Sequence, residues 1–201
     1  MTERSKNPNH PEKGRQIRVD PIRSPDDIAA IKEILFGAPR DLLLFTMGIN
    51  NGVRVGDLLR LKVRDVKSLK AGEFITIKEN KTGKQNILVV NTVVYKALKD
   101  YLQKARPEDE DYLFASRKTK APLTIQAVNA MVKKWTKMIH LDHGNYGAHT
   151  LRKTFGFMQR TKFGVGFEVL ARRFNHSSPK TTMRYLGLKS DEVSEVLLNE
   201  I

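Results

Sequence analysis

Four side chains in the second half of the chain could together bind and attack a phosphate ester. Tyr185 stands nine residues after His176, and His149 and Arg152 lie further upstream with a spacing of three. A tyrosine hydroxyl attacks a phosphodiester only where cations hold the phosphate and offset the charge that builds on its oxygens. A spacing of three places His149 and Arg152 on one helix face, and a guanidinium offers two parallel donors to two phosphate oxygens. These residue types and spacings predict a tyrosine nucleophile with a phosphate clamp.

Further charged residues precede this group in the chain. We expect Arg54 to open a short helix on which Asp57, three residues later, holds the guanidinium in place. Lys81 and Lys84 are expected in a hairpin loop, where a cation is mobile enough to enter a nucleic-acid groove. Each motif alone also fits an ordinary surface ion pair, a loop lysine or a packed tyrosine. Their order along the chain is what makes the set informative.

The charge balance predicts a polyanionic partner. The chain has 36 Lys and Arg against 22 Asp and Glu, a formal charge of +14 and a pI of about 10.0, which is typical of a nucleic-acid-binding domain. An anionic membrane surface is the alternative explanation. No apolar run approaches the ~20 residues of a membrane span, and the chain starts without the apolar stretch of a signal peptide. We therefore expect a soluble, cytoplasmic protein that binds nucleic acid.

Thiol, metal and nucleotide chemistry find little support in the sequence. The absence of cysteine excludes disulfides, thiol catalysis and thiolate metal sites. His140 and His143 are three apart, but no further pair of ligands has metal-site spacing. Gly83 and Lys84 are followed by Gln85 rather than by the Ser or Thr of a phosphate-binding P-loop. We expect neither a metal nor a cofactor.

The spacing of apolar residues predicts a mainly helical scaffold for these side chains. Ser24 and Pro25 suit a helix start, and a second helix over residues 39–50 ends at the turn signal of Asn51 and Gly52. A short helix between Ser178 and Gly187 would carry Tyr185 back toward His176. Further helices are predicted over residues 54–61, 93–103, 124–139, 149–162, 167–174 and 191–199.

A small sheet is predicted near the amino-terminal side of this helical domain. Residues 63–66, 74–78 and 87–90 are short β-branched runs, and residues 80–84 between the last two are rich in turn formers. The predicted fold class is α+β, mainly helical, with one three-stranded antiparallel sheet. Residues 1–22 are polar and basic and predict a flexible arm, followed by one domain over residues 23–201.

The ordered set of motifs resembles the catalytic domain of the tyrosine recombinases, the phage integrase family, over residues 24–199. The resemblance makes Tyr185 the nucleophile and Arg54 and Arg152 the two phosphate clamps. It aligns Lys81, the first lysine of the turn, with the general acid that protonates the leaving 5'-oxygen. His149 would accept a proton or orient the nucleophile. The chain would be a short member of the family that lacks the amino-terminal core-binding domain.

The resemblance assigns roles to the remaining candidates as well. His176 would donate a hydrogen bond to a non-bridging phosphate oxygen, and Asp57 would be an acceptor near Arg54. Lys84 and Arg184 would contact DNA. The family has Ser where this chain has Gly56, so the match is close but incomplete at that position.

The implied activity is site-specific cleavage and rejoining of DNA through a 3'-phosphotyrosyl intermediate, without ATP. The implied partner is double-stranded DNA with specific recombination sites, bound by a homo-tetramer in which the last helix could dock on a neighbour. Such a protein of a prokaryotic mobile element would be associated with the nucleoid. A type IB topoisomerase and a catalytically silent DNA-binding regulator of the same fold are the alternatives.

Overall fold

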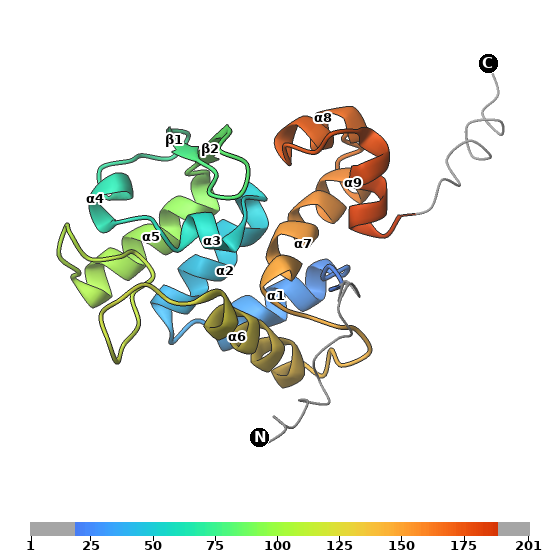
Figure 1. Ribbon diagram of the computed structural model, residues 1–201. Coiled ribbons are helices and arrows are strands. Elements are labelled where there is room, and N and C mark those ends of the chain that lie inside the picture. Colours follow the sequence, from blue (N-terminus) through green and yellow to red (C-terminus); the bar gives the residue numbers. More distant parts are fainter. Residues whose placement is uncertain (1–18, 189–201) are drawn as a thin grey trace, which may run out of the picture.

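The computed structural model describes residues 19–188 of the 201-residue chain (Figure 1). This part is mainly helical with one small sheet, which confirms the predicted α+β class. The predicted helix over residues 191–199 lies outside the described residues. The helices are α1 (Pro25–Ile34), α2 (Pro39–Asn51), α3 (Val55–Leu58), α4 (Val63–Val66), α5 (Thr92–Ala105), α6 (Ile125–Met138), α7 (Ala148–Thr161), α8 (Phe167–Arg173) and α9 (Pro179–Leu186).

Capping side chains set the helix starts that the sequence predicts. Ser24, Thr124 and Ser178 each accept a hydrogen bond from a backbone N–H two or three residues later, at 3.1 to 3.2 Å. Such bonds satisfy donors that the first helical turn leaves free. Gly187 ends α9 with a φ of 71°, a left-handed conformation that suits glycine. The short helix that carries the candidate nucleophile therefore has defined ends.

Two strands, β1 (Phe74–Lys78) and β2 (Gln85–Val89), form the antiparallel sheet. Leu88 is fully buried, and Ile75 and Ile77 pack on the core from the same face. The side chain of Asn51, at the end of α2, extends this sheet. Its Nδ2 donates to the carbonyl of Val89 at 3.1 Å, and its Oδ1 accepts from the Val89 N–H at 2.7 Å. The hairpin is thereby fixed to the end of α2.

The third predicted strand is wrong, because residues 63–66 form the helical turn α4 in the described part of the chain. Val63 and Val66 are both buried, and a spacing of three fits one face of a helical turn. Asp65 accepts a hydrogen bond from the Lys62 N–H at 2.8 Å. This cap selects the helical conformation over the extended one that the β-branched residues suggested.

The apolar core is divided into two clusters, and α7 reaches from one to the other (Figure 1). The larger cluster includes α1, α2, α5 and α6. The smaller one lies within α8 and α9 and contains Phe167, Leu170, Phe174 and Leu186. Helix α7 packs on α2 and α6 in the main body and on α9 in the smaller unit. Any site between the two clusters must therefore include residues of α7.

The segment before α1 lies along the start of α7. Ile22 is fully buried, and its N–H donates to Thr154 Oγ1 at 2.9 Å. The carbonyl of Asp20 accepts from Thr150 Oγ1 at 2.8 Å. Thr150 in turn caps α7 by accepting from the Gly147 N–H at 3.0 Å. These bonds fix the first turns of the helix that carries His149 and Arg152.

Candidate active site

Arg152 lies at the junction of the two apolar clusters. It is 2% exposed, and its guanidinium donates to the carbonyl of Gly52 from Nη1 and to the carbonyl of Phe174 from Nη2, both at 2.7 Å. The guanidinium also lies 4.5 Å from the centre of the Phe174 ring. Burial lowers the pKa of Arg152 to about 10, so the group stays charged at neutral pH. A buried cation of this kind can stabilise a phosphate strongly because little water screens it.

Gly52 is the residue that lets Arg152 reach α2. It caps α2 with a φ of 59°, and a Cβ at this position would lie 2.2 Å from Cδ1 of Phe155. A larger residue would therefore strain the backbone and displace the helix. The turn signal seen in the sequence thus has a second purpose, which is to present a carbonyl to the candidate clamp.

Arg54 caps the start of α3 and is held by a carboxylate that the sequence did not single out. Its Nη1 forms an ion pair with Glu79 Oε2 at 2.6 Å, and the Glu79 side chain is fully buried. Burial alone would raise the pKa of Glu79, but hydrogen bonds from Thr82, Asn86 and Arg54 and the Arg54 charge lower it to about 2. The pair is therefore ionised, with the Arg54 side chain 18% exposed.

Asp57 does not hold Arg54 as predicted from their spacing. Its side chain is buried, and its Oδ1 accepts from the backbone N–H of Asn80 at 2.9 Å. The spacing of three brings the Asp57 N–H, not its carboxylate, to Arg54, whose carbonyl it contacts at 2.9 Å. Asp57 therefore anchors the β1–β2 turn, next to Lys81, while Glu79 binds the guanidinium.

His176 and Tyr185 lie together, as the short-helix prediction required. Their ring centres are 5.1 Å apart, and Nδ1 of His176 lies 2.9 Å from Oγ1 of Thr182, one turn before Tyr185 on α9. Burial, followed by the charges of Arg152 and Arg54, lowers the pKa of His176 to about 4. The imidazole is therefore neutral at physiological pH.

The hydroxyl of Tyr185 is buried and has no hydrogen-bond partner among the described residues. Burial raises the pKa of Tyr185, while the charge and the close side-chain approach of Arg152, followed by the charge of Arg54, act in the opposite direction. Nζ of Lys153, on α7, lies 5.0 Å from the centre of the ring. The phenol is thus neutral in the free protein and lies within the field of three cations.

His149 and Lys81 complete the group from the exposed side. Part of His149 is exposed to solvent, and the burial of the rest, followed by the charges of Arg152, Arg54 and Lys81, lowers its pKa. Lys81 is exposed in the β1–β2 turn, as predicted. The structure therefore brings six of the predicted residues into one electrostatic neighbourhood. The charges of Arg54 and Arg152 act on all three of His149, His176 and Tyr185.

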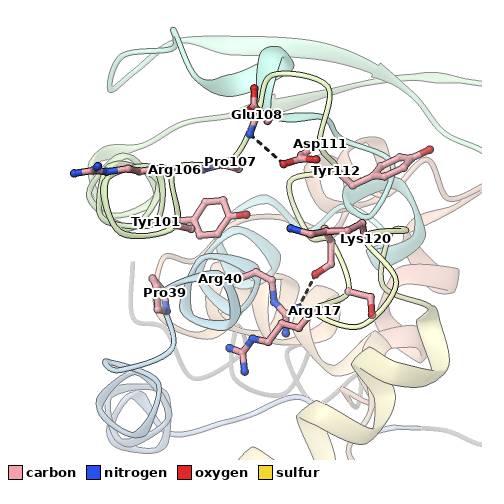
Figure 2. Close-up of a pocket in the computed structure, with 13 residues that line it drawn as sticks. Pro39, Arg40, Tyr101, Arg106, Pro107, Glu108, Asp111, Tyr112, Arg117 and Lys120 are labelled. Atoms are coloured by element: carbon pink, nitrogen blue, oxygen red, sulfur yellow. Dashed lines mark hydrogen bonds between the residues drawn. The ribbon is translucent and has the colours of Figure 1, made fainter.

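Lys84, in the β1–β2 turn, and Arg184, on α9, are both exposed. No hydrogen bond or ion pair joins either side chain to the site within residues 19–188. A cavity of about 410 Å³ lies at the other end of α2 from Gly52 and is lined by Pro39, Arg40 and Tyr101 among others (Figure 2). None of the predicted site residues lines this cavity. Within the described residues, no group of three or more potential metal ligands is found.

Sequence reasoning missed three polar residues that connect the site. Besides Glu79 these are Asn86 on β2 and Arg173 at the end of α8. A signal was present, because Glu79 continues the inward-facing alternation of Ile75 and Ile77, and Asn86 takes the same place before Leu88. Polar residues at inward positions of a strand are expected to have specific partners.

Sequence comparison places the chain in a known family. The sequence model of the Phage integrase family matches residues 25–192. The chain is 35% identical over 176 residues to the probable integrase/recombinase YoeC of Bacillus subtilis (strain 168), covering 86% of this chain and 92% of that protein. It is 30% identical to the tyrosine recombinase XerC of Caldanaerobacter subterraneus, covering 79% of this chain but only 44% of that protein.

Solved structures share the fold. A crystal structure of XerA recombinase matches with a TM-score of 0.72 and 23% identity over 90% of this chain and 67% of that one. XerH recombinase in a pre-cleavage complex with its difH substrate matches with a TM-score of 0.69 and 20% identity, over 90% of this chain and 54% of that one. No described helix is both long enough and apolar enough to cross a membrane. With its match across most of the sequence, the chain belongs to the phage integrase family, the tyrosine recombinases.

Proposed function

We propose that the protein cleaves and rejoins DNA strands at specific sites through a bond between Tyr185 and the 3'-phosphate. The observation that carries this proposal is the buried Tyr185 hydroxyl, whose ring lies against His176 and which lies near the charges of Arg152 and Arg54. Attack by Tyr185 Oη on phosphorus would break the bond to the 5'-oxygen and conserve the phosphodiester energy for rejoining. No external energy source is needed for such an exchange.

Residues of this chain can accept and supply the protons that the proposed reaction transfers. His149, neutral because of its lowered pKa, can accept the proton of the Tyr185 hydroxyl. Lys81, exposed in the β1–β2 turn, would protonate the leaving 5'-oxygen. The 5'-hydroxyl and the phosphotyrosyl bond are then the only products, and the reverse steps rejoin the strand.

His176 fits the predicted role of a hydrogen-bond donor. Its Nδ1 is engaged with Oγ1 of Thr182, which favours the tautomer with the proton on Nε2 when the hydroxyl donates. Nε2 can then donate to a non-bridging oxygen of the phosphate. Arg54 and Arg152 would carry most of the charge stabilisation, because their contributions grow as charge builds on the phosphorane oxygens.

We further propose that the protein assembles as a homo-tetramer on its sites and acts at the nucleoid. A lambda integrase tetramer bound to a Holliday junction has the same fold as this chain, with a TM-score of 0.59. Lys84 and Arg184 would contact the DNA backbone, where lysine and arginine supply most positioning contacts. Such contacts predict DNA binding that weakens steeply as salt rises.

Trapping of the covalent intermediate tests the cleavage chemistry. The substrate is a nicked duplex with a bridging phosphorothiolate at the cleavage point, whose thiol leaving group religates poorly. Wild type should form an adduct on its recombination site and Tyr185→Phe should not. No adduct from either protein on the site would overturn the proposal. Efficient relaxation of a supercoiled plasmid without a site, by a monomer, would instead indicate a topoisomerase.

Lys81→Ala should cleave the ordinary phosphate slowly and the phosphorothiolate at close to the wild-type rate. The thiolate leaving group needs no proton, so the substrate replaces the missing acid. Single-turnover cleavage of the two substrates measures this difference. Equal loss on both would remove Lys81 from the acid role while leaving Tyr185 as nucleophile.

A further inference from the structure

Glu79 is a buried carboxylate with both oxygens occupied. It follows β1 at the start of the turn that carries Lys81, and it is 1% exposed. Its Oε2 accepts from Arg54 Nη1 and from Thr82 Oγ1, both at 2.6 Å. Its Oε1 accepts from Asn86 Nδ2 at 2.8 Å. Three donors from three parts of the chain thus meet at one side chain.

The next link of this network reaches α8. Oδ1 of Asn86 accepts from the Arg173 guanidinium and from the Ile87 N–H. Arg173 also donates to the carbonyl of Ile87 at 2.9 Å and to the carbonyl of Asn51 at 3.0 Å. Because Arg173 ends α8, three residues before His176, one amide connects Glu79 to the unit that holds the histidine and the tyrosine.

The contact with Glu79 fixes one edge of the Arg54 guanidinium. Of the nitrogens of Arg54, Nη1 alone makes a hydrogen bond with the described residues. Nε and Nη2 are left for an anion. Since the guanidinium is planar and rigid, holding Nη1 also sets the direction in which the other two donors point.

We propose that Glu79 is a positioning residue for strand cleavage, which orients the free edge of Arg54 toward the scissile phosphate and holds the Lys81 turn in register with it. The inference rests on the proposed function, because that function gives Arg54 and Lys81 their roles. Glu79 itself acts through these two residues and does not contact the substrate.

A carboxylate is required at this position because every group around it donates. Glutamine would turn an NH₂ group toward Asn86 Nδ2 or toward Arg54 and Thr82. Asn86 cannot compensate by rotating its amide, since its Oδ1 already accepts from Arg173 and Ile87. Glu79→Gln therefore keeps the size of the side chain but loses at least one of the three contacts.

Single-turnover cleavage of the ordinary phosphate and of the phosphorothiolate substrate tests the role, because only the ordinary phosphate needs the acid Lys81. Glu79→Gln should lower the cleavage rate about 10- to 100-fold, the cost expected when a reacting group is misplaced by up to about 1 Å. The affinity for DNA should stay within about twofold of wild type. Glu73→Gln is the matched control, because Glu73 precedes the same strand, is exposed and contacts only the Lys70 N–H through its side chain. It should cleave at the wild-type rate.

The outcomes separate this inference from the proposed function. If wild type forms no adduct, the proposed function fails. If wild type forms the adduct and Glu79→Gln forms it at the same rate, the positioning role fails while the function stands.

A double-mutant cycle with Arg54→Ala distinguishes positioning from a general structural effect. If Glu79 acts mainly through Arg54, Glu79→Gln should change the rate by less than about threefold once Arg54 is gone. The same loss with and without Arg54 would overturn the inference.

A second variant covers the case in which Glu79→Gln fails to fold. Thr82→Val keeps the carboxylate and removes one donor from an exposed turn position. It should slow cleavage about two- to fivefold in wild type and much less in Arg54→Ala. A loss that is independent of Arg54 would count against the role as before, and thermal melting confirms that each variant is folded.

Discussion

Replacing Glu79 by glutamine should make the free energy of unfolding depend less on pH below neutrality. The pKa of Glu79 is lowered from 4.5 to about 2 in the folded protein. A carboxyl whose folded pKa lies below its unfolded pKa stabilises the fold above the unfolded value, and this contribution is lost as the pH falls toward the folded value. At ~1.36 kcal/mol per pH unit, the full contribution is about 3 kcal/mol, of which about 2 kcal/mol is lost between about pH 7 and about pH 3.

Urea unfolding of wild type and Glu79→Gln across this pH range measures the effect. The other carboxyl groups titrate in both proteins, so the difference between the two free energies of unfolding isolates Glu79. That difference should shrink by about 2 kcal/mol as the pH falls to about 3. Glu73→Gln controls for the loss of one exposed carboxylate next to the same strand. Two parallel curves would refute an ionised, buried Glu79 paired with Arg54.

The remaining predictions concern the site itself. Tyr185→Phe should leave the free energy of unfolding unchanged or raise it by up to ~1 kcal/mol, since the buried hydroxyl has no partner; a clear loss in urea unfolding would reveal a hidden hydrogen bond. Arg152→Ala should lower stability by about 2 to 4 kcal/mol, because two buried carbonyls lose their donor, and should reduce cleavage more than DNA binding. Full stability of this variant would contradict the burial. His176 should titrate near pH 4 by NMR, so its ionisation should produce no inflection in the cleavage rate between about pH 6 and 8; such an inflection, absent in His176→Gln, would be inconsistent with a neutral imidazole.

Local signals account for the parts of the fold that the sequence predicts. Ser24, Thr124 and Ser178 are helix caps whose effect depends only on the next few residues, and all three helices begin beside them. The strand prediction for residues 63–66 failed where local preference and local capping disagree. Valine favours extended backbone, but Asp65 completes a turn by binding the Lys62 N–H.

The candidate site likewise contains one pairing that local sequence predicts and one that it does not. Tyr185 and His176 could be paired from the sequence because one short helix connects them. Glu79 could not be paired with Arg54, since 25 residues separate them and Asp57 offered a nearer carboxylate. Both acids are buried, but Asp57 accepts from the Asn80 N–H whereas Glu79 meets Arg54, and these partners follow from the assembled hairpin. The inward alternation of Ile75, Ile77 and Glu79 was the one trace of it in the sequence.

Because the apolar core is divided into two clusters, the residues of the site lie together only while the two clusters are in contact. Tyr185 packs on the small cluster of α8 and α9, whereas Arg54 belongs to the main body, and the links between them include the hydrogen bonds of Arg152 and Arg173. A small unit held in this way is expected to open at a lower free energy than the whole domain, which amide hydrogen exchange of α9 against α2 would measure. Opening of the α8–α9 unit would expose the Tyr185 hydroxyl to solvent and would also separate it from Arg54. Under the proposed function, the closed form would therefore keep the Tyr185 hydroxyl away from solvent, and the opened form would separate it from Arg54.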